Sequence, residues 1–312
     1  MAAALDHPTG GPNGEETDMA EATDPHDVGV VPDLVRINGP FDWQTIDTAV
    51  TIDGAAIVKR LLSDLSVAAL NDEIDAYLAG HVGAGRSATG SDGYDLFLGH
   101  RTIRLHGLVE KLPSGAALIG LPELVGWANR HIAGGGDSVI LNAAELIQIQ
   151  PGEPAQRQHR DTDSWPVTTA DGRPVIVNAI VALDDCTLDN GATYVAPGSW
   201  AWDEGREATD ADWTRAVMNA GDVLLFRGDA VHRGGENTSD GRRRAISVAY
   251  CAGWLRPVEN SYLNVSPETA AKLDPLTQSV LGYAAFNDTP GADGFLGLYE
   301  NGDPRTFLTN QQ

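Results

Sequence analysis

The stretch VILNAAELIQIQPG, residues 139–152, marks the point where the pattern of the chain changes. It is an apolar run that ends at a turn pair, Pro151-Gly152, and more short apolar runs follow it, separated by turn pairs such as Asn190-Gly191. Short apolar runs bounded by Gly, Pro, Asn and Asp are typical of β-strands. The runs that we interpret as strands are Val139 to Ile149, Val175 to Leu183, Thr193 to Ala196, Val223 to Phe226 and Ala245 to Tyr250.

The part of the chain before residue 139 has a helical pattern, apart from a short apolar run at Ala55 to Val58 that we interpret as a strand. A helix that Ser66 or Asp64 can cap has apolar residues at intervals of three and four, namely Val67, Leu70, Ile74, Tyr77 and Leu78. A second helix begins at Pro122, and its apolar face is Leu124, Val125, Trp127, Ala128 and Ile132. Many short strands behind a helical segment predict a mainly β fold with flanking helices, whose core is a double-stranded β-helix, the cupin-like jelly roll.

Two segments differ in composition. Residues 1–38 are rich in Gly, Pro, Ala, Thr and acidic residues and have few large apolar side chains, which predicts a flexible acidic tail. Ordered sequence is expected from about Phe41 and Trp43, so residues 39–312 are expected to form a single large domain. An acidic tail that docks on a partner is the alternative interpretation of residues 1–38.

The charge balance limits the classes of partner. The net charge of -23 comes from 44 acidic and 21 basic side chains, so the surface should repel nucleic acid and anionic membranes. Cys186 and Cys251 are far apart in sequence, which predicts neither a metal-binding pair nor a disulfide framework. We find no secretory signal and no stretch of 18 apolar residues. A soluble cytoplasmic protein is therefore expected.

The chemistry centres on His159, Asp161 and His232. Residues i and i+2 of an extended strand point to the same face, so the first two side chains can reach one metal ion. His232 follows the predicted strand Val223 to Phe226, and we expect it to enter from across the barrel. Two imidazoles and one carboxylate hold Fe(II) on one face of an octahedron and leave three positions open.

Arg243 supplies the second half of this centre. It opens the last predicted strand and shares a face with Ala245, Ser247 and Ala249, whose small side chains leave space beside the guanidinium. A planar guanidinium pairs with a carboxylate through two hydrogen bonds, which suits the distal carboxylate of 2-oxoglutarate. Arg244 faces the other way in this register and takes the role if the register is off by one.

At this point the sequence resembles the phytanoyl-CoA dioxygenase family of Fe(II)- and 2-oxoglutarate-dependent oxygenases. The resemblance runs from about residue 53 to the end, and residues 99–105 and 278–283 are similar to the branch that tailors natural products. The segments that carry it are Gln150 to Gly152, Gln156 to Pro166, Asp189 to Thr193, Pro197 to Ser199, Gly221 to His232, Asn237, and Arg243 to Ser247.

This resemblance implies the roles of individual residues. His159, Asp161 and His232 are implied as iron ligands, and Arg243 as the partner of the 2-oxoglutarate C5 carboxylate. Two further positions, Gln156 and Thr193, match residues that hydrogen-bond 2-oxoglutarate, although a loop amide bonded to backbone and a strand hydroxyl are the alternatives from the residues alone. Fe(II) is the implied cofactor, with 2-oxoglutarate and O2 as co-substrates and a small organic molecule as substrate.

Two features bear on the reaction. Asp161 stands where a Gly or Ala would leave a ligand position for chloride, so hydroxylation is favoured over halogenation. The same oxidant can also desaturate, cyclise or epoxidise a substrate, and these reactions are the alternatives. Arg233 follows the second histidine where this family usually has Ser or Gly, which changes the expected polarity beside it. A metal- or ligand-binding jelly roll without oxygenase activity is the alternative function, and it has no need for Arg243.

The substrate end of the site is less defined by sequence. Side chains that can line its mouth or belong to the core are Phe97, Asp163, Trp165, Phe226 and Trp254. The Gly-rich stretch Gly83 to Gly99 is either a lid or an inert loop. Neither the substrate nor the oligomeric state follows from the sequence.

Overall fold

The computed structural model describes residues 33–39, 41–85, 89–132, 138–165, 172–203, 205–286 and 296–309. Seven strands form the larger sheet in the order β1-β2-β8-β5-β10-β4-β3. Its strands are antiparallel except for the pair β1 and β2, which is parallel. Their bounds are β1 Val35–Ile37, β2 Ala55–Val58, β3 Thr102–Leu105, β4 Val139–Ile149, β5 Ile176–Ala182, β8 Val223–Arg227 and β10 Arg243–Ala252.

A smaller sheet of three short strands has the order β7-β6-β9. Its strands are β6 Tyr194–Val195, β7 Thr214–Arg215 and β9 His232–Arg233. An isolated bridge pairs His159 with His232 and so extends this sheet by one residue. Together the two sheets form the double-stranded β-helix that the sequence predicts, and the predicted fold class is confirmed.

Helices precede and follow the strands along the chain. The first six are α1 Trp43–Asp53, α2 Asp64–Gly80, α3 Asp92–Leu98, α4 Leu108–Lys111, α5 Pro113–Ile119 and α6 Pro122–His131. The last four are α7 Ser261–Asn264, α8 Pro267–Ala270, α9 Pro275–Val280 and α10 Arg305–Thr309. Short 3-10 helices within the described residues include η1 Asp161–Ser164, η2 Ser199–Ala201 and η3 Asp210–Asp212.

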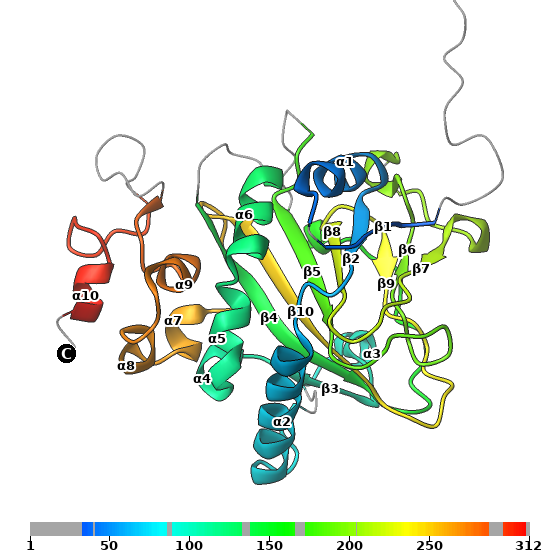
Figure 1. Cartoon of the computed structure of the whole chain (residues 1–312), viewed down its shortest axis with the longest axis horizontal. Coiled ribbons are helices and arrows are strands. Elements are labelled where there is room, and N and C mark those ends of the chain that lie inside the picture. Colours follow the sequence, from blue (N-terminus) through cyan, green and yellow to red (C-terminus); the bar gives the residue numbers. More distant parts are fainter. Residues whose placement is uncertain are drawn as a thin grey trace, which may run out of the picture. The chain divides into compact units, whose positions relative to one another are not determined.

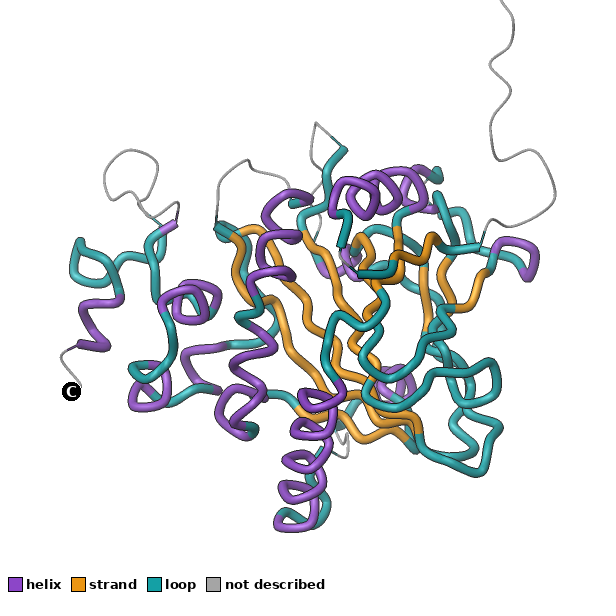
Figure 2. The backbone as a smooth tube through the Cα atoms, viewed as in Figure 1, coloured by secondary structure: helices purple, strands orange, loops and turns teal. Residues whose placement is uncertain are grey.

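Helices cover one face of the larger sheet. Figure 1 shows α4, α5 and α6 lying along the β4 side of the sheet, and α6 contacts β4, β10 and β5. In Figure 2 the strands, drawn in orange, lie between the helices and a region of loops. The hydrophobic core therefore lies between the helices and the sheet, and it leaves the opposite face of β4, β10 and β5 free to line a site.

The first predicted helix is confirmed as α2, with Val67, Leu70 and Ile74 buried. Its cap differs from the prediction, because Ser63, and not Ser66 or Asp64, accepts a hydrogen bond from the Ser66 backbone amide. The second predicted helix is confirmed as α6, with Pro122 in its first turn.

The boundary of the predicted tail differs from the structure in its last residues. Val35–Ile37, which the sequence analysis placed in the tail, form β1 and pair with β2, and Leu34 beside them is buried. Three residues are too few to show a two-residue alternation, and pairing with β2 supplies the backbone hydrogen bonds that stabilise them. Residues 1–32 lie outside the described residues, so a flexible tail stays a prediction.

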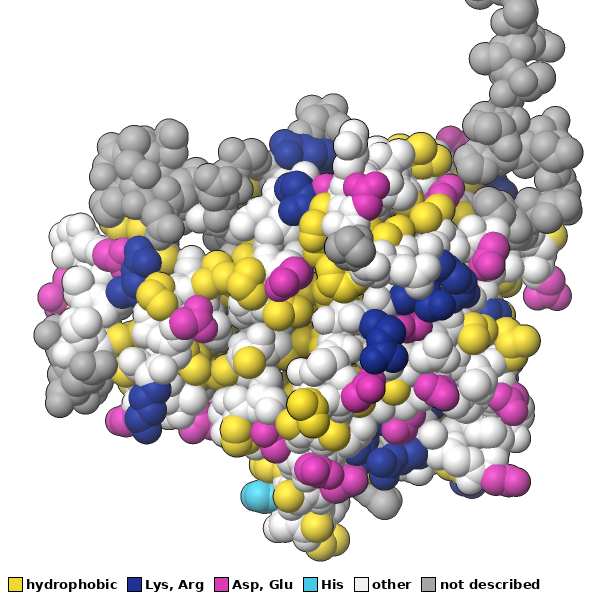
Figure 3. Space-filling model, in the orientation of Figure 1, with side chains coloured by type: hydrophobic (Ala, Val, Ile, Leu, Met, Phe, Trp, Pro, Cys, Tyr) yellow, Lys and Arg dark blue, Asp and Glu magenta, His cyan; other side chains and the backbone are white. Residues whose placement is uncertain are grey.

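The described surface carries both signs of charge. Figure 3 shows Asp and Glu side chains interspersed with Lys and Arg over the visible face. Within the part of the chain that the structure describes, none of the helices is long and apolar enough to cross a membrane.

Candidate active site

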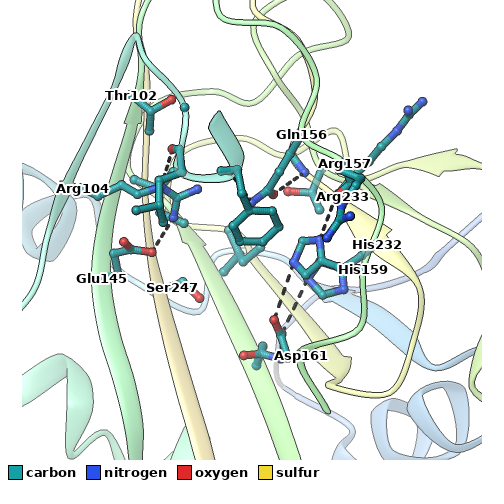
Figure 4. A pocket seen from close by; sticks show the side chains of 18 of the residues that line it. Thr102, Arg104, Glu145, Gln156, Arg157, His159, Asp161, His232, Arg233 and Ser247 are labelled. Carbon is teal, nitrogen blue, oxygen red and sulfur yellow. Dashed lines mark hydrogen bonds and ion pairs between the residues drawn. The ribbon is translucent and has the colours of Figure 1, made fainter. Parts of the chain in front are cut away.

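Three potential metal ligands meet at one end of the barrel. Their ligand atoms, from His159, Asp161 and His232, all lie within 4.8 Å of one another. The Asp161 carboxylate lies between the two rings, 3.7 Å from His159 Nε2 and 3.6 Å from His232 Nε2 (Figure 4). The structure therefore brings together the three residues that the sequence pattern selected.

The route by which they meet differs from the prediction in two respects. Asp161 opens the 3-10 helix η1 and does not continue a strand, but Arg160 before it is extended, with φ -116° and ψ 138°, so the i and i+2 side chains still share a side. His232 does not enter from across the barrel. It lies directly beside His159, because the two backbones exchange both hydrogen bonds of an antiparallel bridge.

Hydrogen bonds to the backbone fix which ring nitrogens face the centre. The Nδ1 of His159 donates to the Arg157 carbonyl and the Nδ1 of His232 to the Ala230 carbonyl, each at 3.0 Å. A proton on Nδ1 leaves the Nε2 lone pair of each ring for a metal ion. Burial, with the neighbouring His232 imidazole, lowers the pKa of His159 to about 4, so this ring is neutral near pH 7.

The donor set fits Fe(II). Two imidazoles and one carboxylate are the ligands of the 2-His-1-carboxylate type, and each of the three has a hydrogen bond that orients it. Asn178 Nδ2 donates to Asp161 Oδ2 at 2.8 Å, which completes this set. Asn178 was not predicted from the sequence, although a single amide within an apolar strand indicates a specific contact.

Arg243 lies at the first residue of β10, on the face that lines the cavity. It is buried, and burial lowers its pKa from the ordinary arginine value. Its Nη2 donates to the Gly191 carbonyl, whereas its buried Nε has no hydrogen-bond partner within the described residues. A buried guanidinium with a free donor is suited to a carboxylate, so this residue fits 2-oxoglutarate.

Gly191 has φ 104°, and a Cβ there would lie 3.1 Å from the Gly235 carbonyl oxygen. The turn therefore requires glycine in order to present its carbonyl to Arg243.

Arg244 resolves the question of strand register. Its side chain lies on the opposite face of β10, fully buried, and donates to Gln148, Asn71 and Asp75. Gln148 is buried, whereas the Asp75 side chain is 53% exposed, and none of the three partners lines the cavity. The register predicted from the alternation of small residues is thus the observed one.

Gln156 and Thr193 also line the cavity. Gln156 Oε1 accepts from the Gly234 amide and its Nε2 donates to the Phe97 carbonyl, so the side chain is bonded to backbone in this state. Thr193 is buried, and no hydrogen bond of its hydroxyl is formed within the described residues. Their contacts to 2-oxoglutarate stay predictions.

The cavity that contains these residues has a volume of about 1240 Å³. Ligand pockets typically have roughly 300–1,000 Å³, so this one has room for a substrate besides 2-oxoglutarate. Its floor is formed by β10, where Ser247 and Ala249 follow Arg243 on the same face, with Ala143 of β4 opposite Ala249. These small side chains explain the volume, and they confirm the space that the sequence analysis expected beside Arg243.

Of the side chains expected at the substrate end, Phe97, Asp163, Trp165 and Phe226 line the cavity, whereas Trp254 does not. The ring of Phe97, from α3, lies edge-on to His159, with centroids 4.9 Å apart. The Gly-rich stretch from 83 to 99 therefore contains a helix that borders the site, and its residues 86–88 lie outside the described residues.

Opposite the metal ligands, the cavity has a charged wall that the sequence analysis missed. Arg104 Nη1 donates to Glu145 at 2.6 Å, and His106 Nε2 lies 3.1 Å from the other oxygen of that carboxylate (Figure 4 shows the Arg104 pair). Burial pushes the pKa of Glu145 up, but the two cations more than offset it, so that pKa lies below its ordinary value. These residues come from β3, β4 and the segment after β3, and only folding brings them together.

Arg233, the departure from the family pattern, is held by aromatic rings. Its guanidinium lies 4.3 Å from the centroid of Tyr194 and 4.9 Å from that of Trp213. Cation–π contacts of this kind hold the cation on the smaller sheet next to His232.

Comparison with known proteins identifies the family. The family model for phytanoyl-CoA dioxygenase (PhyH) matches residues 51–245. The chain belongs to this family. Membership confirms the resemblance stated from the sequence and the predicted enzyme class, an iron- and 2-oxoglutarate-dependent dioxygenase.

Relatives of this phytanoyl-CoA dioxygenase family protein are dioxygenases of fungi. The chain is 33% identical to the dioxygenase FUM3 of Gibberella moniliformis, over 74% of this chain and 79% of that protein. It is 29% identical to the dioxygenase swnH1 of Metarhizium robertsii, over 91% of this chain and 95% of that protein.

A solved structure with the same fold is the non-heme alpha-ketoglutarate-dependent carbocyclase SnoK from nogalamycin biosynthesis. Its TM-score is 0.56 at 20% identity, and the match covers 72% of this chain and 90% of SnoK. The epimerase SnoN, solved with Fe3+, alpha-ketoglutarate and nogalamycin RO, has a TM-score of 0.54 at 22% identity, covering 74% of this chain and 92% of SnoN. At this identity the likeness is one of fold.

Proposed function

We propose that this dioxygenase hydroxylates a C–H bond of a small organic molecule and converts 2-oxoglutarate to succinate and CO2. His159, Asp161 and His232 are the proposed iron ligands, and Arg243 the proposed partner of 2-oxoglutarate. The observation that carries the proposal is the unpaired Nε of buried Arg243 in the same cavity as the three ligand atoms. A metal-binding jelly roll without oxygenase activity has no use for such a group.

The residues of the chain bind and orient the reactants. The two histidines and Asp161 would hold a metal ion at the wall of the cavity. Bound there with 2-oxoglutarate and O2, iron supplies the oxidant for the C–H bond. Arg243 pairs with the C5 carboxylate of 2-oxoglutarate, and Thr193 supplies a hydroxyl beside it. Gln156 reaches the co-substrate by releasing the Phe97 carbonyl.

Exclusion of water falls to the apolar residues around the metal ligands. The ring of Phe226 lies 4.7 Å from that of His232, and Phe97 borders His159 on the other side. A dry environment strengthens the pairing of Arg243 with a carboxylate and protects reactive species from solvent.

Hydroxylation is the proposed outcome, because Asp161 occupies the third protein ligand position and leaves none for a halide. The substrate is proposed to be a product of secondary metabolism, which is consistent with the biosynthetic origin of the solved neighbours SnoK and SnoN. A cytoplasmic location and the absence of nucleic-acid and membrane partners also stay proposals, supported by the net charge of -23 and the composition of the chain.

The test is spectroscopic. Anaerobic addition of Fe(II) and 2-oxoglutarate to the protein should give a visible charge-transfer band, and Asp161→Ala should abolish it. Asp163→Ala is the matched control, since Asp163 lies in the same 3-10 helix and its carboxylate accepts only from the Arg160 amide within the described residues. This variant should retain the band. Failure of the unaltered protein to give any band overturns the proposal.

A further inference from the structure

The strand β5 contains one polar side chain that its surroundings do not favour. All seven residues from Ile176 to Ala182 are buried, and Asn178 is the one that is not apolar. An amide transferred to such an environment costs about 1–3 kcal/mol unless it forms hydrogen bonds. Asparagine is also disfavoured in strands. Its presence therefore calls for a specific contact.

The contact is with the proposed iron ligand Asp161. Asn178 Nδ2 donates to Asp161 Oδ2 at 2.8 Å, across 17 residues of sequence. The direction of this bond is not ambiguous, because an ionised carboxylate only accepts and the amide nitrogen only donates. The orientation of the Asn178 side chain is thereby set.

Asp161 needs such a contact more than the two histidines do. Each histidine is bonded through Nδ1 to a carbonyl of its own segment, two residues earlier. Asp161 opens a short 3-10 helix and its side chain is 29% exposed. Among the described residues, the bond from Asn178 is the hydrogen bond that its carboxylate accepts. Without it, rotation of the carboxylate would be limited only by the two imidazoles.

The larger sheet gives this anchor its rigidity. Asn178 pairs with Ala249 of β10 on one side and with Phe226 of β8 on the other. Phe226 in turn contacts the His232 ring. Two neighbouring residues on paired central strands thus each contact one proposed ligand.

We propose that Asn178 is a positioning residue that holds the Asp161 carboxylate in the orientation that binds the metal ion. The inference rests on the proposed function and adds a residue to it. Partners of this kind that orient a metal ligand typically contribute 10–100-fold in metal affinity. Asn178 connects Asp161, the proposed ligand on η1, to the larger sheet. The position of the Asp161 carboxylate therefore depends on the register of β5.

The experiment compares Asn178→Ala with Asn142→Ala. Asn142 is also a buried amide that lines the cavity, on β4, but its Oδ1 accepts from the backbone of Val258 and not from a side chain of the metal site. Co(II) serves as a probe that is stable in air, and titration followed by its visible ligand-field bands gives affinity and geometry together. Urea unfolding of each variant gives the loss of stability.

Asn178→Ala should bind Co(II) about 10–100-fold more weakly and with altered ligand-field bands. Asn142→Ala should retain the affinity and the bands of the unaltered protein, even with a similar loss of stability. Asn178→Leu, which suits a buried apolar strand, repeats the test if the alanine variant does not fold. Affinity and bands unchanged in a folded Asn178 variant overturn the inference, as do equal losses in both asparagine variants.

Failure of the proposed function gives a different result. In that case the unaltered protein itself gives no charge-transfer band with Fe(II) and 2-oxoglutarate, whether or not it binds Co(II). If the unaltered protein and a folded Asn178 variant both give the two signals in full, the proposed function stands and only the role of Asn178 is ruled out.

Discussion

Neighbouring arginines on β10 have opposite surroundings. Arg243 has an unpaired Nε in the cavity, whereas Arg244 is bonded to three side chains on the opposite face of the strand. Side chains alternate between the two faces of a strand, so the two arginines lie on opposite faces of β10. Replacing Arg243 should therefore affect 2-oxoglutarate binding, and replacing Arg244 should affect the stability of the fold.

Arg243→Ala should weaken 2-oxoglutarate binding by roughly 30-fold or more, because it removes one partner of a buried charge pair. Arg244→Ala should instead lower the free energy of unfolding by about 1–3 kcal/mol, since it leaves the buried side-chain oxygen of Gln148 without its donor. Calorimetric titration with 2-oxoglutarate and urea unfolding measure the two effects. The reverse assignment of effects would show that Arg244 holds the co-substrate.

The charge of His106, in the cavity wall, should make the stability of the fold depend on pH. Hydrogen bonds with Glu145 and then Glu259 raise the pKa of its imidazole to about 9, from an ordinary value of 6.5. Protonated His106 therefore stabilises the fold fully below about pH 6.5, and this contribution is lost as the pH rises through about 9.

Relative to His106→Gln, the unaltered protein should lose stability between about pH 6.5 and pH 9.5. The difference should be no more than about 1 kcal/mol, because the ring is half exposed and solvent screens the ion pairs. Urea unfolding at a series of pH values measures it. A difference that grows with rising pH would contradict the assigned charge state.

At the scale of elements, α2 shows how its apolar stripe supports the barrel. Leu70 is 2% exposed on the buried side of the helix, whereas Leu65 in the first turn is 84% exposed. Leu70→Ala should lower the free energy of unfolding by about 2–5 kcal/mol, and Leu65→Ala should change it by no more than about 0.5 kcal/mol. Denaturant unfolding of the pair tests this, and equal effects would mean that α2 does not pack as described.

For the whole molecule, binding and stability are linked. With Mn(II) or Fe(II) present, 2-oxoglutarate at 100 times its dissociation constant should stabilise the fold by about 2.7 kcal/mol, which thermal unfolding detects as a rise in Tm. The rise should need the metal and should be absent in Asp161→Ala. Stabilisation by 2-oxoglutarate that is independent of metal would point to a second anion site and away from the proposed one.

The sequence by itself determined the enzyme class and most of the residues proposed for it. His159, Asp161 and His232 follow from motif and spacing, and Arg243 was preferred over Arg244 by the two-residue alternation of a strand. The double-stranded β-helix also followed, because apolar runs and turn pairs report local structure. Local patterns of this kind depend on neighbours in the chain, and these are visible without a structure.

Only the tertiary structure decided which distant side chains meet. The bridge between His159 and His232, the ion pair of Arg104 with Glu145, and the bond from Asn178 to Asp161 all join separate segments. Strand pairing across the sheets fixes these contacts, and no periodicity in one segment encodes the register of another. For the same reason β1 was missed, since three residues become a strand only when β2 supplies the hydrogen bonds.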